Sequence, residues 1–379
     1  ILSYDAALAI NPNYVRAIYR KGRLYQSQGP GQEGLYTGFY NTAIAKDANY
    51  APVYNTLYNY YYETNVPRSA EYLNKWLNVS DDDPKACYSR ASIKYAQGLF
   101  AEAITKANEC IAVGGMSVYP NLYGVKALAA NRLGDSVTAK ASYEEYFKKQ
   151  IPQIGAGDYS AYAMILLKFP GNEALAASYV DKAVALDSTE ANRVNYLKAL
   201  GAAFVSQKNF SEAARWYEKI LAFKRNYTNV DIYNAGYNYY RARIYDSSIL
   251  AFKKYTIKYP EDMFGYYMLA KATSGIDSTG NLGTSEIAYL KAVEIGEKAA
   301  DKEKIKVNLT EAYLFLRNYY YDVKKDQTTA LLFADKGIAL DSLNQKLKDE
   351  REIIKKNDPK LSKPQKPVKP VQAIKPQKK

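Results

Sequence analysis

Histidine is absent from this chain of 379 residues, and cysteine occurs only twice. Histidine is the commonest side chain for general base catalysis and for metal binding, so its absence excludes Ser-His-Asp triads. Two cysteines are too few for a disulfide-rich scaffold or a four-cysteine zinc site. The sequence also has no Walker-type phosphate loop and no Gly-x-Gly-x-x-Gly fingerprint. We therefore expect a non-enzymatic protein with no catalytic residue, no cofactor and no metal.

Long apolar runs are missing as well. No run in the sequence is long enough to cross a bilayer as a helix. The first residues do not have the composition of a signal peptide. The sequence thus predicts no transmembrane segment.

Positive charge is concentrated at the end of the chain. The formal net charge is +13, and residues 357–379 hold seven Lys against one Asp, a contribution of +6. Five Pro and no aromatic residue fall in the same segment, so we expect it to be disordered. We favour a solvated spacer, because the segment lacks aromatic side chains for stacking on bases. The alternative is a tether to an anionic surface, such as nucleic acid or the lipid of a peripheral membrane contact.

One stretch, residues 204–220, reads FVSQKNFSEAARWYEKI. An apolar helix end runs into a short turn, and a second helix opens with apolar residues three and four positions apart. Just upstream, Gly201 is small enough for another helix to cross closely. This helix-turn-helix pattern resembles the core of a tetratricopeptide repeat, a unit of 34 residues.

The rest of the chain repeats this unit. Consensus repeats place a small residue in the first helix and an alanine twelve positions later in the second helix. Small residues occur in this register at Gly22, Ala91, Ala127, Gly201, Gly236, Ala270 and Ala312. The second-helix position is filled by Ala103, Ala139, Ala176, Ala213, Ser248 and Ala330. Tyr58 departs from the pattern, because it stands where a small residue is expected, and we expect its two helices to be spread apart.

The resemblance implies an all-α fold, a right-handed α-solenoid of tandem helix-turn-helix units. We expect about eight repeats over residues 13–342, a capping helix over 343–356 and a disordered Lys/Pro-rich tail over 357–379. Residues 1–12 resemble the second half of an incomplete repeat. Half a repeat cannot bury its apolar face, so we expect further residues upstream of Ile1, where any targeting signal would lie.

The repeat register also relates the two cysteines. Cys87 falls near the start of a first helix, and Cys110 falls near the end of its antiparallel partner helix. These positions face each other, so the geometry permits a disulfide, which would imply an oxidising compartment. The alternative is a pair of buried free thiols that act as small apolar side chains.

The resemblance further implies that first helices line a concave groove. Positions that point into such a groove recur at fixed offsets from the small residue. In this sequence they are Tyr19, Arg23, Asn55, Asn59, Tyr62, Tyr88, Tyr95, Asn131, Lys198, Tyr233, Tyr237, Tyr240, Arg241, Tyr267, Lys271 and Tyr313. Tyrosine rings, amides and cations without any acidic residue would suit an extended, acidic peptide. The alternative is that many of these tyrosines pack between adjacent first helices.

Some tetratricopeptide proteins bind C-terminal carboxylates through a two-repeat clamp of Lys, Asn and Arg. Asn55, Asn59 and Lys85 match part of that clamp. Ser89 stands where the clamp needs an Arg, and Tyr19 stands where it needs its first Lys. Because the clamp is incomplete, we do not transfer its specificity to this chain.

These observations favour a scaffold for protein–protein contacts. We expect a subunit of a bacterial envelope assembly, such as a secretion or motility machine, that binds other proteins and no nucleic acid. Its location would be periplasmic or associated with the outer membrane. The alternatives are a cytosolic adaptor or co-chaperone that binds peptide tails, and an enzyme whose catalytic domain lies upstream of Ile1.

Overall fold

The computed structural model describes residues 1–357 except 81–83, 115–117, 150–153, 278–279 and 281–282. Its regular structure is helical, and no strand occurs among the described residues, which confirms the all-α prediction. Most of the predicted Lys/Pro-rich tail, residues 358–379, lies outside the described residues. The chain divides into two compact units, Ile1–Leu186 and Asp187–Lys379, called here the N-terminal and C-terminal units.

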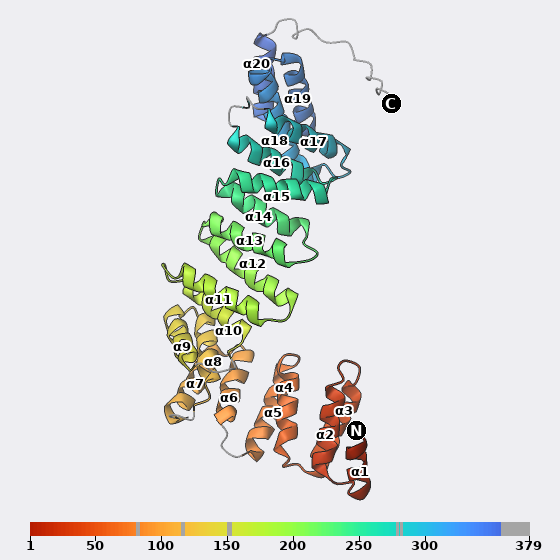
Figure 1. Ribbon diagram of the computed structural model, residues 1–379, viewed down its shortest axis with the longest axis vertical. Coiled ribbons are helices and arrows are strands. Elements are labelled where there is room, and N and C mark those ends of the chain that lie inside the picture. The colour runs from red at the N-terminus through yellow and green to blue at the C-terminus, as the bar shows by residue number, and fades with distance from the viewer. Residues whose placement is uncertain (81–83, 115–117, 150–153, 278–279, 281–282, 358–379) are drawn as a thin grey trace. The chain divides into compact units, whose positions relative to one another are not determined.

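The N-terminal unit is a series of helices, each packed on the next along the chain (Figure 1). Its helices are α1 (Leu2–Ile10), α2 (Val15–Gln26), α3 (Glu33–Lys46), α4 (Ala51–Tyr62), α5 (Val66–Val79), α6 (Pro84–Ala96), α7 (Phe100–Gly114), α8 (Asn121–Arg132), α9 (Ser136–Lys148), α10 (Ala156–Leu166) and α11 (Glu173–Leu186). From α2 onward these helices form five consecutive pairs.

The C-terminal unit continues the same organisation. Its helices are α12 (Glu190–Ser206), α13 (Phe210–Phe223), α14 (Asn229–Arg241), α15 (Tyr245–Lys258), α16 (Met263–Ile276), α17 (Thr284–Lys298), the 3-10 helix η2 (Glu303–Ile305), α18 (Lys306–Asn318), the π-helix η3 (Tyr319–Val323), α19 (Gln327–Leu340) and α20 (Gln345–Asn357). Four pairs run from α12 to α19. The described part of the chain therefore holds nine pairs, against the roughly eight repeats that the sequence pattern predicts.

Most helix pairs close over the small residues that set the repeat register. The second-helix positions are fully buried, namely Ala103, Ala139, Ala176, Ala213, Ser248 and Ala330. The approach is close enough to require the missing side chain at Gly236, where an added Cβ would lie 2.9 Å from the ring of Phe252. Ser248 uses the same crossing for a hydrogen bond, and its hydroxyl donates to the Gly236 carbonyl at 2.9 Å.

The expected spreading of α4 and α5 at Tyr58 does not occur at this crossing. The hydroxyl of Ser69 in α5 donates to the Tyr58 carbonyl at 2.8 Å, much as Ser248 does at Gly236. The tyrosine ring lies instead against Trp76, with ring centroids 6.2 Å apart and planes tilted by 24°. A large residue is tolerated here because the small Ser69 of α5 meets the Tyr58 backbone at the crossing, while the ring packs on Trp76.

Tyrosine supplies much of the core. Tyr40, Tyr143 and Tyr146 are among the largest fully buried side chains. Rings of this size bury a large apolar area, which compensates for the scarcity of Phe and Trp in this sequence. Tyr143 has a buried hydroxyl without a hydrogen-bond partner among the described residues.

The predicted capping helix corresponds to α20, which packs on α19. Leu347 and Ile354 of α20 are fully buried. Arg317 of α18 is buried as well, and it donates from Nη2 to the Glu350 carbonyl at 3.2 Å. Its Nη1 also lies 3.3 Å from the Glu350 carboxylate. Apolar packing and a buried ion pair together hold α20 against the last helix pair.

A disulfide links the two helices of the third pair. Cys87 of α6 and Cys110 of α7 are bonded in the structure, with Cα atoms 5.9 Å apart. That separation is typical of disulfides. The pair joins the start of a first helix to the end of its partner helix, as the repeat register permits.

Candidate functional site

Several predicted groove residues bond one first helix to the next. In the N-terminal unit the hydroxyl of Tyr19 in α2 lies 2.9 Å from Thr56 Oγ1 in α4. Arg23 Nη1 donates to the same Thr56 oxygen at 3.3 Å. Tyr19 is buried. These contacts support the interpretation that Tyr19 packs between adjacent first helices. The neighbouring Arg23 remains exposed.

The same kind of link recurs further along the N-terminal unit. Arg132 Nε of α8 donates to the hydroxyl of Tyr95 in α6 at 3.5 Å. Lys168 Nζ, just after α10, donates to Asn131 Oδ1 of α8 at 2.7 Å. Both contacts lie at the exposed surface, so Tyr95 and Asn131 join neighbouring repeats and remain accessible.

Four predicted residues meet in one polar pocket. The pocket has a volume of about 310 Å³ and lies mainly between α4 and α6. It is lined by Asn55, Tyr58, Asn59, Tyr62, Trp76, Lys85, Tyr88, Ser89, Ser92 and Tyr119. Asn55, Asn59, Tyr62 and Tyr88 are predicted groove residues, and Lys85 and Ser89 occupy clamp positions. We call this hollow the α4–α6 pocket.

The polar groups of the α4–α6 pocket are only partly engaged with one another. Asn59 Nδ2 donates to the Asn55 carbonyl at 2.8 Å. This bond orients the Asn59 side-chain amide, whose Oδ1 atom accepts no hydrogen bond from the described residues. The Tyr62 hydroxyl lies 2.6 Å from Ser92 Oγ. Burial raises the pKa of Tyr58, Tyr62 and Tyr88, so their hydroxyls stay neutral near pH 7.

The chemistry of the α4–α6 pocket is that of recognition. Neutral amides and phenols can donate and accept hydrogen bonds, and Lys85 adds one ammonium group. This set suits a peptide backbone or a carboxylate. Ser89 is buried and cannot replace the bidentate arginine that a complete carboxylate clamp would need.

In the C-terminal unit, the predicted tyrosines of α14 form a stack. Tyr233 and Tyr237 have ring centroids 5.1 Å apart with planes tilted by 14°, and Tyr237 and Tyr240 follow at 6.4 Å and 18°. The Arg241 guanidinium lies 3.8 Å from the Phe210 ring centroid and 5.8 Å from that of Tyr237. The stacked rings pack on one another and are half-buried.

Two predicted cations of the C-terminal unit are paired with acids. Lys271 Nζ of α16 lies 3.1 Å from the Glu311 carboxylate of α18, which also accepts from the buried Tyr267. Lys198 of α12 lies 3.4 Å from Asp231 of α14. The expectation of a groove without acidic residues is therefore wrong in this unit, because Glu311 and Asp231 neutralise the cations.

Both carboxylates are held in the charged form. Burial would raise the pKa of Asp231, but hydrogen bonds from Lys224 and Thr228 outweigh it and lower the pKa to about 2. For Glu311, burial is likewise outweighed by hydrogen bonds from Tyr267 and Lys271, which lower its pKa. Asp231 has a signal in the sequence, since it completes a capping box with Thr228 at the start of α14.

Tyr313 does not belong with the other first-helix residues. It is buried, and its hydroxyl donates to Glu297 of the second helix α17 at 2.9 Å. Glu297 also accepts from Lys336 of the second helix α19 at 2.7 Å. The interpretation of Tyr313 as a groove residue is therefore corrected, because its side chain is tied to second helices.

The described residues show neither a metal site nor a membrane span. No group of three or more Cys, Asp or Glu side chains among them could hold a metal ion. Within the same residues, every helix is too short or too polar to cross a membrane.

Tandem helix pairs with a buried small residue at their crossings define a tetratricopeptide-type scaffold. Several solved structures are similar to this chain. The C-terminal part of a tetratricopeptide-repeat-containing protein from Cytophaga hutchinsonii is 26% identical, with 69% of this chain and 97% of that chain covered and a TM-score of 0.47.

Two further solved structures are similar to this chain at lower identity and lower TM-score. The Cut9–Hcn1 hetero-tetramer of APC/C is 13% identical over 89% of this chain and 58% of that chain, with a TM-score of 0.39. The TPR2AB domain of yeast Sti1, solved in complex with pHSP90, is 14% identical over 69% of this chain and 97% of that chain, with a TM-score of 0.28. No family model matches the chain, and no curated protein matches it.

Proposed function

We propose that this protein is a non-catalytic scaffold that binds an extended, acidic peptide segment in the α4–α6 pocket. The observation that carries the proposal is the gathering of Asn55, Asn59, Lys85 and Tyr88 around one hollow of about 310 Å³. An extended peptide leaves its backbone groups free to bond with the two amides. A carboxylate of the ligand would meet the Lys85 ammonium.

The charge distribution supports the N-terminal unit as the site for an acidic ligand. In the C-terminal unit, Lys198 and Lys271 already face carboxylates. In the N-terminal unit, Arg132 and Lys168 bond to neutral groups at Tyr95 and Asn131. A cation beside neutral partners keeps its attraction for an anion, whereas a cation in an ion pair is already largely neutralised.

We further propose that the scaffold works in an oxidising compartment, as a subunit of a bacterial envelope assembly. The bond between Cys87 and Cys110 supports this proposal, because structural disulfides persist in the periplasm and are rare in the cytosol. A periplasmic or outer-membrane-associated location follows from the same reasoning.

Fluorescence anisotropy with the full chain tests the binding proposal. The probe is a labelled, unstructured peptide of about ten residues, a span of roughly 33 Å when extended, with acidic residues and a free C-terminal carboxylate. Asn59→Ala and Lys85→Ala are each expected to weaken binding by about fivefold to twentyfold. Asn74→Ala, an exposed position on α5, is the matched control. Equal affinity of all four proteins would contradict the proposal.

A further inference from the structure

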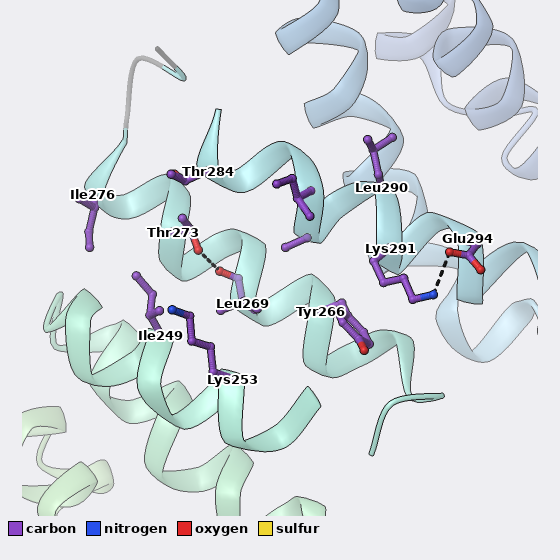
Figure 2. A pocket seen from close by; sticks show the side chains of 12 residues that line it. Ile249, Lys253, Tyr266, Leu269, Thr273, Ile276, Thr284, Leu290, Lys291 and Glu294 are labelled. Atoms are coloured by element: carbon purple, nitrogen blue, oxygen red, sulfur yellow. Dashed lines mark hydrogen bonds and ion pairs between the residues drawn. The ribbon is translucent and has the colours of Figure 1, made fainter. Parts of the chain in front are cut away.

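A second hollow lies in the C-terminal unit, among helices whose residues are absent from the predicted groove. It has a volume of about 730 Å³ between α15, α16 and α17, and Figure 2 shows the side chains that line it. Tyr266, Leu269, Thr273 and Ile276 of α16 follow one another at spacings of three and four, so they form one stripe along that helix. We call this hollow the α15–α17 groove.

Aliphatic side chains form the walls of the α15–α17 groove and are open to solvent. Ile249 of α15 and Leu290 of α17 line the groove together with the stripe on α16 (Figure 2). Ile287 of α17 is 75% exposed and Ile276 of α16 is 50% exposed. Aliphatic side chains that line one hollow and stay partly exposed offer an occupant apolar surface to bury.

The walls favour an α-helix over an extended segment. Apart from Ile276 and Thr284, which stand at helix ends, the residues that line the groove lie inside α15, α16 and α17, and their backbone groups bond within their own helices. The Thr273 hydroxyl is also engaged, since it donates to the Leu269 carbonyl at 2.6 Å. An extended segment would therefore bury most of its backbone N–H and C=O groups without partners. A helix satisfies its own backbone and presents only side chains.

The rim supplies a charge for the occupant to match. Lys253 of α15 is exposed and has no ion-pair partner among the described residues. On the opposite wall, Lys291 is paired with Glu294 at 2.9 Å, and Glu294 also pairs with Lys298 at 2.8 Å. The groove thus presents one uncompensated cation among its described residues, on its α15 side.

We propose that the α15–α17 groove docks an amphipathic helix of another protein, with an apolar stripe toward α16 and a carboxylate toward Lys253. The stripe from Tyr266 to Ile276 is about 15 Å long at 1.5 Å per residue, so the docked helix needs about three turns. A second copy of this chain fits less well. A two-fold contact opposes the same patch on both copies, and two facing hollows leave each other unfilled.

A library selection on the full chain tests this proposal and needs no identified partner. The probes are displayed random peptides of about 15 residues, or about 22 Å as helices. Expected sequences carry apolar residues at helical spacing and an acidic residue on one flank. Their binding should fall about tenfold in Ile287→Glu and stay unchanged in the control Val307→Glu, which alters an exposed residue of α18.

A charge swap makes the test specific to Lys253. Lys253→Glu should weaken the selected peptides about fivefold, and replacement of their acidic residue by lysine should restore binding to that variant. The proposal is overturned if the library yields no binders, or if the binders lack helical spacing or ignore Ile287→Glu. It is equally overturned if sedimentation shows a dimer that Ile287→Glu dissociates, since the groove would then be an interface between copies.

Discussion

Glu311 of α18 places a carboxylate oxygen 3.1 Å from the ammonium group of Lys271 in α16. The same carboxylate accepts from Tyr267, so one acidic residue anchors a cation and a phenol of the preceding first helix. The consequence is electrostatic. The first helices of the C-terminal unit carry the tyrosines that the sequence predicts. Their cations Lys198 and Lys271, however, are neutralised by acidic partners.

Removal of this carboxylate should convert the C-terminal unit into a better anion binder. We expect Glu311→Gln to raise the affinity of the full chain for an oligoglutamate peptide by roughly twofold to fivefold at low salt, with the gain lost at high salt. Fluorescence anisotropy at two ionic strengths measures the effect. The control is Glu303→Gln, which alters an exposed residue of η2. An equal gain in peptide affinity in this control would contradict the prediction, because it would show that the effect comes from net charge alone.

The disulfide gives a prediction for the N-terminal unit. The bond closes a loop over a sequence separation of 23 residues, which corresponds to about 3 kcal/mol in the chain-entropy account. Reduction should therefore lower the melting temperature of the unit. Trp76 lies in this unit and Trp216 in the other, so a Trp216→Phe background isolates the signal. The double variant Cys87→Ser/Cys110→Ser should melt at the reduced temperature with or without reductant.

Free thiols would contradict this prediction. If iodoacetamide labels both cysteines of the natively isolated, denatured protein in the absence of reductant, the pair is not bonded in the cell. The proposal of an oxidising compartment would then lose its support.

Two glycines should respond in opposite directions to the same change. Gly236→Ala places a Cβ 2.9 Å from Phe252 at the crossing of α14 and α15, and overpacking of this kind costs about 1–3 kcal/mol. Gly38→Ala in α3 meets nothing within 4 Å and should stabilise its unit by about 0.5–1 kcal/mol. Urea unfolding followed by circular dichroism compares them. Unchanged or higher stability of Gly236→Ala would contradict the assignment of Gly236 to a helix crossing, and a loss of stability in Gly38→Ala would contradict the open surroundings of Gly38.

The repeat register explains how much of the fold could be predicted from the sequence. Alanine and glycine at the helix crossings could be recognised from the sequence, because they recur at fixed spacing and only small side chains allow two helices to approach closely there. The prediction at Tyr58 is wrong because the direction of a ring is set by its neighbour, here Trp76. Glu311 could not be predicted because it reaches Lys271 across 40 residues, from a position that the groove offsets do not include.

The binding surfaces were predictable to different degrees. The α4–α6 pocket lies mainly between two successive first helices. The repeat register therefore predicts from the sequence that Asn55, Asn59 and Tyr88 lie near one another. The α15–α17 groove combines residues from a second helix, the next first helix and its partner. No single repeat contains that surface, so a pattern read one repeat at a time could not indicate it.

Asp231 gives a pH dependence to the C-terminal unit. Its folded-state pKa of about 2 lies below its ordinary value of 3.8. A lowered carboxyl pKa adds stability that is complete above the ordinary value and is lost as the pH falls toward the folded value. We expect a loss of about 2 kcal/mol between about pH 5 and pH 2, read from the urea midpoint of Trp216 fluorescence. Asp231→Asn should be less stable at neutral pH and should lack this part of the acid sensitivity.

The most direct test of the proposed scaffold function uses Trp76, because this side chain lines the α4–α6 pocket. In the Trp216→Phe background, titration with the unlabelled acidic peptide should change Trp76 emission to saturation, and Asn59→Ala should shift the midpoint to higher peptide concentration by about fivefold or more. A peptide that binds by anisotropy, leaves Trp76 emission unchanged and keeps its affinity for Asn59→Ala would contradict the account.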